Sequence, residues 1–413
     1  MGAERASFGA GAVVERTILV LNGGSSSIKF ALYGTAPLAC RLSGNIDRIG
    51  HEGARLSVAE QPDGRKSAQA LPAGDHRSAT DALIEWLDAR DSFAAIEAVG
   101  HRVVHGMDHV APERVTPGLL DELRRLGPID PDHLPLEIEM IEAVARRYPR
   151  LPQVVCFDNA FHRTLPRVAQ LLPIPRRYDA KGIRRYGFHG LSYEYLMEAL
   201  QRCSGGAAAR GRVVLAHLGS GASMAAVIDG RSIDTSMGFT PTAGLPMSTR
   251  SGDLDPGLAA YLERSEQLSA SEFFALASHE SGLLGVSETS ADMRDLLNLE
   301  VSDVRAAEAV ALFCYQAKKC VGAYAAAMSG LDTLVFSGGI GENGQAVRAR
   351  ICEGLGFLGI ELDAMRNAAH AEVISTDTSR VTVRVIRTDE ESMIARSVSR
   401  VLHLDKSGEG QPR

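Results

Sequence analysis

Two stretches of this chain share one pattern: an apolar strand, a turn rich in glycine and serine, and a second apolar strand. In the first stretch, residues 18–21 (ILVL) precede the turn and residues 28–33 follow it. In the second, residues 213–216 (VVLA) and 223–228 flank a similar turn. Such a turn exposes backbone N–H groups and hydroxyls on one side, which is how a chain holds phosphate oxygens. The repetition predicts one structural unit used twice, with two turns that grip a polyphosphate from both sides.

The composition is that of a globular protein with more than one domain. The 413 residues are 45% hydrophobic and 23% charged, which is ordinary for such proteins. The net charge of -7 argues against a general nucleic-acid binder, because no basic excess is available to neutralise a phosphate backbone. The 6 cysteines are scattered without metal-ligand spacing and predict reduced core thiols of a cytosolic protein. No apolar run approaches a membrane span, so no membrane association is expected.

Strands and helical patterns alternate along the chain, which predicts an α/β fold. The first sixteen residues lack the apolar stretch of a signal peptide and are expected to form a disordered extension. Apolar runs predict buried strands at residues 153–157, 331–336 and 381–386. Helical spacing and end signals predict helices at residues 81–90, 117–126, 135–147, 303–328 and 393–402.

One glycine motif offers a competing interpretation. Residues 339–344 (GIGENG) satisfy GxGxxG after a strand, and Glu361 follows about twenty residues on, as in dinucleotide-binding proteins. In that fold the motif usually opens the domain and further βαβ units follow, whereas one clear strand remains here. A nicotinamide-dependent oxidoreductase is therefore the less favoured alternative. The chain has no GxxxxGK[ST] sequence, which excludes a P-loop nucleotide hydrolase.

Several polar residues suit either a structural or a functional role. His101 and His105 are four residues apart, but the Glu of HExxH is absent and the valines between them favour a strand, so we assign them structural roles. Arg102 is either paired with a carboxylate in the fold or kept to receive an anion. Asp158 follows a predicted strand, where α/β sheets place ligand groups. His189 lies between two glycines that leave room for a ligand, and both of its roles stay open.

Taken together, these segments resemble the acetate kinase (acetokinase) family, which belongs to the sugar kinase, Hsp70 and actin superfamily. The resemblance extends from residue 18 to residue 396. It is carried by ordered motifs at residues 22–29 (NGGSSSIK), 100–106 (GHRVVHG), 157–162 (FDNAFH), 186–190 (YGFHG), 234–241 (DTSMGFTP), 249–257 (TRSGDLDPG) and 337–343 (SGGIGEN).

The resemblance implies two duplicated actin-like (ribonuclease H-like) lobes with a nucleotide cleft between them. Residues 17–162 and 396–413 would form the N-terminal lobe, and residues 163–395 the nucleotide-binding C-terminal lobe. The implied reaction is reversible, in-line phosphoryl transfer from ATP to a short-chain carboxylate with Mg²⁺ or Mn²⁺, giving an acyl phosphate and ADP. Acetate is the expected acid, and a propionate- or butyrate-type kinase and a catalytically inactive nucleotide-binding regulator are alternatives. A cytoplasmic homodimer is also implied.

The resemblance further implies roles for individual residues. The transferred phosphoryl group and the acyl carboxylate would be surrounded by Arg102, Asp158, His189 and Arg250. The acid substrate would contact Arg102, Val104, His133, Phe188 and Pro241. The nucleotide would be bound by Ser25, Ser27, Lys29, His217, Gly219, Ser220, Gly221, Asp292, Met293, Arg294, Gly339, Ile340, Gly341, Glu342 and Asn343. The metal ion would be held by Asn22 and Glu390.

The chemistry of the implied reaction makes these roles reasonable. A free carboxylic acid with a pKa of roughly 4 to 5 is already ionised at neutral pH and needs no general base. Asp158 is therefore expected to position a ligand rather than to remove a proton. Arg102 and Arg250 would offset the repulsion between carboxylate and phosphate. His189 would donate a hydrogen bond to a phosphoryl oxygen in the transition state.

Departures from the family pattern bear on specificity more than on reaction type. Ser220 stands where the family usually has Asn, so one amide contact to phosphate is lost. Asp132 stands where the family has the Leu that walls the methyl pocket. A carboxylate at that place would repel an anionic substrate unless it is paired or turned away. Asp389 replaces Asn before Glu390.

Overall fold

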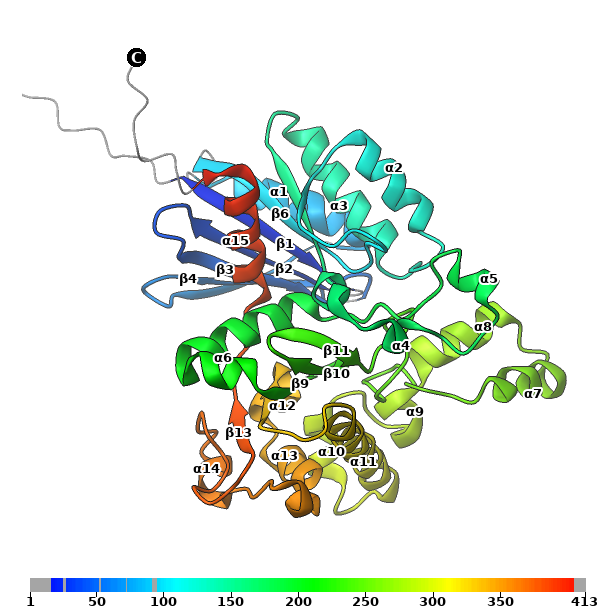
Figure 1. The fold of residues 1–413 in the computed structure, drawn as a ribbon. Helices are drawn as coiled ribbons and strands as arrows, with labels where there is room; N and C mark the ends of the chain where they lie inside the picture. Colours follow the sequence, from blue (N-terminus) through cyan, green and yellow to red (C-terminus); the bar gives the residue numbers. More distant parts are fainter. Residues whose placement is uncertain (1–15, 25–26, 52, 72, 91–94, 405–413) are drawn as a thin grey trace, which may run out of the picture. The chain divides into compact units, whose positions relative to one another are not determined.

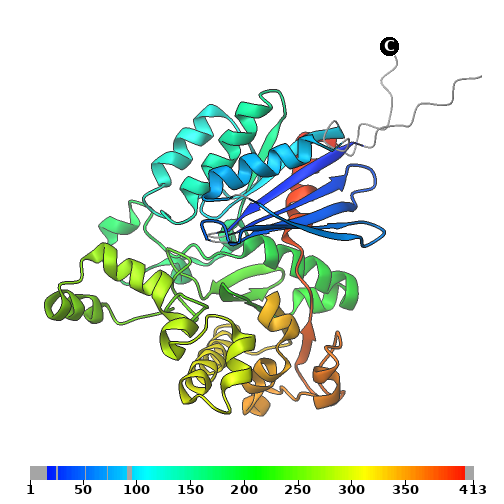
Figure 2. The same cartoon turned by 180° about the vertical axis from the view of Figure 1, so that it is seen from behind.

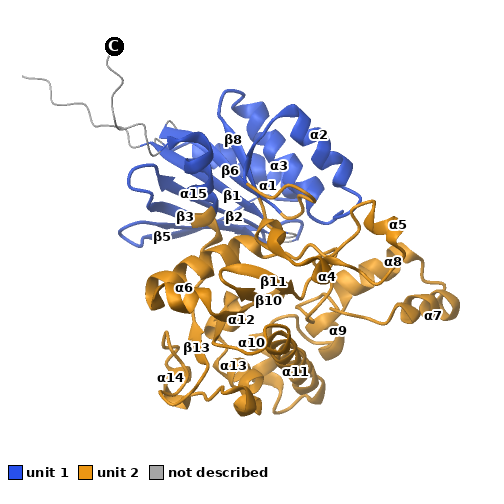
Figure 3. Cartoon of the chain, viewed as in Figure 1, with its two compact units in different colours: residues 1–103, 112–156, 394–413 blue, residues 104–111, 157–393 orange. Residues whose placement is uncertain are grey.

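The computed structural model describes residues 16–24, 27–51, 53–71, 73–90 and 95–404, and the chain forms two compact units (Figures 1 and 3). Unit 1 comprises Met1–Val103, Pro112–Cys156 and Ile394–Arg413. Unit 2 comprises Val104–Ala111 and Phe157–Met393. Nearly all of the extension predicted at residues 1–16 lies outside the described residues.

The division of the chain differs from the lobes expected at 162/163 and 395/396. Residues 157–162 belong to unit 2 because their side chains bond within it. The Asp158 carboxylate accepts the backbone N–H of His189 at 2.8 Å, and His162 Nδ1 lies 2.8 Å from Ser232 Oγ. Val104 likewise packs in the core of unit 2, which brings residues 104–111 into that unit.

Unit 1 is built on one sheet, whose described strands follow the order β5-β4-β3-β2-β1-β6-β8-β7. β1 pairs antiparallel with β2 and parallel with β6, and β2 pairs antiparallel with β3. The strands are β1 (Thr17–Gly23), β2 (Ser27–Gly34), β3 (Cys40–Asp47), β4 (Arg55–Glu60), β5 (Lys66–Ala70), β6 (Ile96–Val103), β7 (Glu113–Arg114) and β8 (Gln153–Phe157).

Helices cover both faces of the unit 1 sheet. α1 (His76–Asp88) and α3 (Leu134–Arg147) share a core with β1 and β2, and α2 (Pro117–Leu126) packs on α3. α15 (Glu390–Leu402) lies on the opposite face, so Figure 2 shows α1 in front of the sheet and α15 behind it. The α15 contact is close, because a Cβ at Gly100 of β6 would lie 2.5 Å from Ile394 Cγ2. Only glycine at that position lets helix and strand approach so far.

Unit 2 contains a second sheet with the order β11-β10-β9-β12-β13. β9 pairs antiparallel with β10 and parallel with β12, while β10 pairs antiparallel with β11. The strands β3, β2, β1 and β6 have the same order and directions, so the structural repeat predicted from the sequence is confirmed. The strands are β9 (Arg212–Leu218), β10 (Ala222–Ile228), β11 (Arg231–Thr235), β12 (Thr333–Ser337) and β13 (Thr382–Val385).

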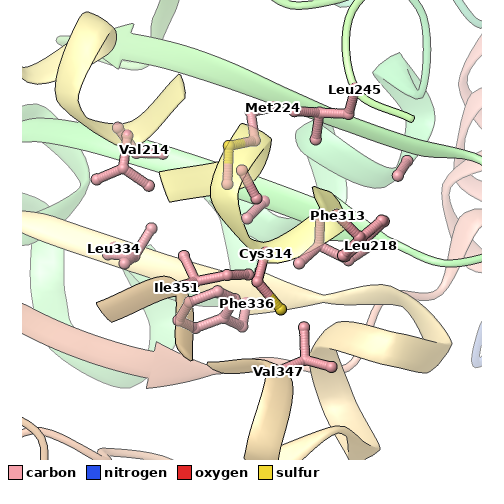
Figure 4. Close-up of a cluster of buried hydrophobic side chains, with 14 of the residues drawn as sticks. Val214, Leu218, Met224, Leu245, Phe313, Cys314, Leu334, Phe336, Val347 and Ile351 are labelled. Carbon is pink, nitrogen blue, oxygen red and sulfur yellow. The ribbon is translucent and has the colours of Figure 1, made fainter. Parts of the chain in front are cut away.

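Alternate residues of the unit 2 strands face two different helices. Val214, Leu334 and Phe336 join the core beneath α11 (Val304–Ala327), as Figure 4 shows for part of this cluster. Val213 and Leu215 point the other way, toward α6 (Gly190–Arg210). This period of two is the reason why a fully apolar strand can be buried on both faces.

Most predicted elements are present, with ends that shift by a few residues. β8 and α2 have the predicted bounds. α1 begins at His76 instead of residue 81 because the Asp75 carboxylate caps it, accepting the Ser78 N–H at 2.7 Å. The sequence did not predict the short elements η2 (Ala160–Thr164), α4 (Arg167–Gln170), α5 (Arg176–Asp179), α8 (Ala270–Ala275), η3 (Leu276–Glu280), α9 (Gly282–Ser287), η4 (Leu355–Leu358) and α14 (Ala364–Ala368).

The described helices and thiols bear on two further expectations. None of the described helices is both long and apolar enough to cross a membrane. The described cysteines are free thiols, and Cys156, Cys314 and Cys352 are buried as predicted. The core assignment is wrong for Cys203, which is exposed in the second half of α6.

His101 has a structural setting in the core of unit 1. Its side chain is 2% exposed, and its Nε2 lies 2.6 Å from Oε1 of Gln153, so the Nε2–H donates to the amide oxygen. Burial lowers the pKa of His101 to about 4. Among the described residues no group of three or more His, Cys, Asp or Glu side chains is placed to hold a metal ion.

His101 should make folding stability depend on pH. Its folded pKa of about 4 lies below the ordinary value of 6.5, so the unfolded chain binds the proton first as the pH falls. This one group should therefore cost about 2 kcal/mol of stability between roughly pH 7.5 and pH 5. We expect His101→Gln to lose less stability over this range than wild type in urea unfolding. Equal losses of stability in the two proteins would contradict the lowered pKa of His101.

Candidate active site

Two stacked imidazoles lie beside the glycine-serine turn between β9 and β10. His217 is in β9, and His189 immediately precedes α6. The ring centroids are 4.3 Å apart with an interplanar angle of 27°. A Cβ at Gly219 would lie 3.9 Å from His217 Nε2, and one at Gly221 would lie 3.2 Å from His189 Nε2. The Nε2 atom of each ring is therefore next to the turn.

Arg250 approaches the same turn. A Cβ at Gly221 would lie 3.7 Å from its Nη1, which donates to the backbone carbonyl of Pro241 at 3.3 Å. The structure thus brings together three residues that the sequence assigned separately, namely Arg250, His189 and Gly221. A positive guanidinium and an imidazole beside bare backbone suit the binding of phosphate oxygens.

Asp158 holds the start of α6. Its carboxylate is fully buried and accepts the backbone N–H groups of His189 at 2.8 Å and Leu191 at 3.3 Å. Its own carbonyl accepts the Gly190 N–H at 2.7 Å. These bonds keep His189 in the left-handed region, with a φ of 60°. In this setting Asp158 positions His189.

The glycines on either side of His189 serve close packing and not ligand access. A Cβ at Gly187 would lie 2.4 Å from Thr235 Cγ2, and one at Gly190 would lie 2.2 Å from the Asp158 carbonyl oxygen. The sequence-based expectation that these glycines leave room for a ligand is therefore wrong. The space beside both glycines is filled by the protein itself.

The turn also borders a cavity within unit 2 of about 750 Å³. Ligand pockets in proteins commonly measure about 300–1,000 Å³. Predicted nucleotide-binding residues that line this cavity are Gly219, Ser220, Asp292, Met293, Arg294, Gly339, Ile340 and Asn343. The lining also includes Ser248, Ala291, Leu297 and Gly344, which the sequence analysis missed. Ser248 donates its N–H to the Ser220 carbonyl at 3.1 Å, a contact between distant residues that no local pattern reveals.

One wall of the cavity is the start of α10 (Met293–Leu299). The Asp292 carboxylate caps this helix by accepting the Arg294 N–H at 2.8 Å. It also receives the Arg294 guanidinium, with Nη2 at 2.5 Å. The hydrogen bond to the Arg294 side chain lowers the pKa of Asp292. The carboxylate is thus ionised at neutral pH, and its charge is balanced by Arg294.

Another wall of the cavity is formed by α12 (Gly338–Asn343), which follows β12. A Cβ at Gly339 would meet nothing within 4 Å, so this position opens onto free space. Gly341 and Glu342 are not among the cavity-lining residues, although the sequence assigned them to the nucleotide. Glu342 Oε1 instead accepts the backbone N–H of Gly338 at 3.1 Å and of Thr388 at 3.2 Å. Glu342 joins α12 to the chain that follows β13.

The residues assigned to the acyl group within unit 2 are buried. Val104 and Phe188 belong to its hydrophobic core, and Pro241 is buried as well. His105 follows Val104, and its ring centroid lies 4.7 Å from that of Tyr186 and 5.3 Å from that of Phe188. These aromatic contacts hold the segment next to Val104 in place, and they agree with the structural role predicted for His105.

The remaining assigned residues are distributed over the chain. Asn22 is buried near the end of β1, Ser27 and Lys29 are in β2, and Arg102 is in β6. His133 is buried in unit 1, with its Nδ1 2.8 Å from Asp130 Oδ1, and the neighbouring Asp132 is half-buried. Glu390 begins α15. Ser25 lies outside the described residues.

The sheets and the site together define a class of protein: a duplicated α/β fold whose repeated strand-turn-strand unit carries a phosphate-type turn at the edge of a ligand-sized cavity. The acetokinase family matches residues 17–396, and the chain belongs to this family. The oxidoreductase alternative is not supported, because the sheet that carries residues 339–344 has an antiparallel meander, β9-β10-β11, in place of successive βαβ units.

The chain is similar to acetate kinases and propionate kinases from several organisms. An acetate kinase from Rhodopseudomonas palustris is 46% identical over 394 residues, covering 93% of this chain and 98% of its own length. A propionate kinase from Citrobacter rodentium is 42% identical over 390 residues, covering 93% and 96%. The solved structure of Porphyromonas gingivalis acetate kinase matches with a TM-score of 0.83 at 36% identity, covering 94% of this chain and 100% of its own. A Francisella tularensis propionate kinase matches with a TM-score of 0.86 at 35% identity, covering 92% and 98%.

The position of Glu342 leads to a stability prediction. Glu342→Ala removes the acceptor of two backbone N–H groups and should lower the free energy of unfolding by about 1–3 kcal/mol. Glu353→Ala is the matched control, because Glu353 is exposed after α13 (Gln345–Cys352) and should change stability by no more than about 0.5 kcal/mol. Urea unfolding measures both variants. An equal effect of the two would show that the Glu342 contacts do not support α12.

Proposed function

We propose that this protein is a carboxylate kinase, which transfers the γ-phosphoryl group of ATP reversibly to a short-chain acid and forms an acyl phosphate and ADP. Acetate is the expected acid. The observation that carries the proposal is the cluster of His189, Arg250 and Gly221 beside a cavity of about 750 Å³. A nucleotide in this cavity would extend its phosphates along the turn that contains Gly219 and Ser220.

The chemistry of acyl phosphate formation matches the side chains of this site. The attacking carboxylate is ionised at neutral pH, so the site needs charge compensation and alignment rather than a base. Arg250 supplies positive charge, and a neutral His189 supplies an N–H donor for a phosphoryl oxygen. The buried Val104, Phe188 and Pro241 would hold the apolar end of the acid. This wall would direct the carboxylate oxygen toward the phosphorus.

A divalent ion, Mg²⁺ or Mn²⁺, would accompany the nucleotide. The assignments of Asn22 and Glu390 to this ion, and of Ser27, Lys29 and Arg102 to the phosphates, rest on the family resemblance. Mg²⁺ usually keeps several waters and is held by one or two protein oxygens together with substrate phosphates. Asn and Glu side chains offer such oxygens, and the lack of a His, Cys, Asp and Glu cluster among the described residues agrees with that mode. When bound, the ion neutralises phosphate charge.

A propionate kinase is the second candidate. It is supported by the propionate kinases that match at 42% identity in sequence and at a TM-score of 0.86 in structure.

We also infer a cytoplasmic homodimer from the family resemblance.

Removing the guanidinium of Arg250 tests its assigned role. Arg250→Ala should lower kcat/KM for acyl phosphate formation by about a hundredfold or more, because a charge that stabilises the transition state is lost. Arg102→Ala should do the same. Arg305→Ala is the control, since Arg305 pairs with Glu288 at the surface of unit 2. Near-normal turnover of Arg250→Ala in a coupled ADP assay would refute the role.

The choice of acid tests the function itself. We expect hydroxylamine to trap an acyl phosphate from ATP with acetate and with propionate, and the yield to fall with butyrate as the acyl chain outgrows the buried wall of Val104 and Phe188. Asp132→Leu should raise kcat/KM for acetate, because it removes a negative charge from the pocket that the family forms with Leu. Absence of hydroxamate with every acid would refute the kinase, and an unchanged kcat/KM in Asp132→Leu would show that this carboxylate is harmless.

A further inference from the structure

Each of the stacked imidazoles is connected to two hydroxyl groups in series, of which only that of Thr388 is not fully buried. His189 Nδ1 lies 2.8 Å from Ser223 Oγ, which lies 2.5 Å from the hydroxyl of Tyr193. His217 Nδ1 lies 2.8 Å from Ser192 Oγ, which accepts the hydroxyl of Thr388 at 2.8 Å. Each chain contains one residue of α6, and these two residues, Tyr193 and Ser192, are adjacent.

The direction of hydrogen-bond donation along the first chain follows from Tyr193, at its buried end. Tyr193 is fully buried, and burial raises the pKa of its hydroxyl, which therefore keeps its proton. A phenol is a stronger hydrogen-bond donor than an aliphatic hydroxyl, so the Tyr193 proton is directed to Ser223 Oγ. The single proton of Ser223 is then available to Nδ1 of His189, 2.8 Å away.

The second chain has the same direction. The backbone N–H of Thr388 is bound to Glu342, and its hydroxyl donates to Ser192 Oγ. The Ser192 proton is then available to Nδ1 of His217. A neutral imidazole that accepts at Nδ1 carries its proton on Nε2, and Nε2 is the atom of each ring that lies beside the turn.

We propose that two pairs of positioning residues fix the stacked rings as Nε2–H tautomers. Tyr193 with Ser223 sets the tautomer of His189, and Thr388 with Ser192 sets that of His217. The stacked pair then presents two neutral hydrogen-bond donors to the phosphates at the turn. This inference rests on the proposed kinase function. A neutral pair also suits the stacking, because two imidazolium ions at 4.3 Å would repel each other. The tautomer of each ring is thus set from behind the ring, by residues that do not touch the substrate.

The tautomers can be read directly by ¹⁵N NMR of histidine-labelled protein, with His189 and His217 assigned from the His189→Gln and His217→Gln variants. We expect both rings to carry hydrogen on Nε2 and none on Nδ1. In Ser223→Ala, His189 should lose this preference and populate the Nδ1–H form. A wild-type His189 with its proton on Nδ1 would overturn the proposal.

Kinetics provide the second readout. Ser223→Ala and the isosteric Tyr193→Phe should each lower kcat on the order of tenfold while KM for ATP stays within about twofold, because they alter a supporting hydrogen bond rather than a substrate contact. The matched control is Ser232→Ala. Ser232 is also a fully buried strand serine 2.8 Å from a histidine Nδ1, that of His162, but it lies outside the stacked pair.

The outcomes separate this inference from the function on which it rests. Unchanged kcat and an unchanged His189 tautomer in Ser223→Ala would overturn the inference, and so would an equal loss of kcat in Ser232→Ala. If Ser223→Ala does not fold, Tyr193→Phe decides by the same two measurements. If wild-type protein forms no acyl phosphate, the proposed function fails, while the NMR result still decides whether the hydroxyl chains set the tautomers.

Discussion

The buried carboxylate of Asp158 is the interaction on which the site in unit 2 depends. Asp158 directly follows β8, and its carboxylate accepts backbone N–H groups at the start of α6. A carboxylate at a helix start is favoured by the unpaired N–H groups and by the helix dipole. By holding His189 in a left-handed conformation, it aligns that ring with His217 and orients the first turn of α6. The stacking of His189 on His217 and the hydroxyl contacts of Ser192 and Tyr193 therefore depend on the hydrogen bonds of Asp158.

The repeated sheet explains why the turn is available for a ligand. Almost every side chain of β9 and β10 is buried, because one face of these strands packs against α11 and the other against α6. The turn between them is left with glycine and serine, which have little side chain to bury. Backbone groups therefore become the accessible chemistry at this point. In unit 1, β1 and β2 pair in the same antiparallel way as β9 and β10.

Unit 2 keeps its site rigid through buried polar groups that are paired. Arg348 is fully buried and donates to the carbonyls of Gly341, Glu342 and Asn367, so it ties the end of α12 to the chain near Asn367. Burial lowers the pKa of its guanidinium to about 10, which leaves it charged at neutral pH. Similarly, burial lowers the pKa of His162 to about 4, and its two nitrogens contact Ser232 and the Phe188 carbonyl. Paired groups of this kind specify one arrangement, because each unpaired alternative would cost desolvation energy.

The sequence by itself determined the α/β class, the duplicated strand-turn-strand unit, the helices α1, α2, α3, α11 and α15, and the family; it did not predict α6. These depend on local periodicity and on ordered motifs, both of which are readable along the chain. It also indicated Gly219, Ser220, Asp292 and Gly339, which line one cavity. Only the tertiary structure decided that Glu342 supports α12, that the glycines beside His189 serve packing, and that Ser223 and Tyr193 lie behind His189. The reason is physical: these roles depend on which atoms lie within about 3 Å of one another, and residues far apart in sequence meet at that distance only through packing.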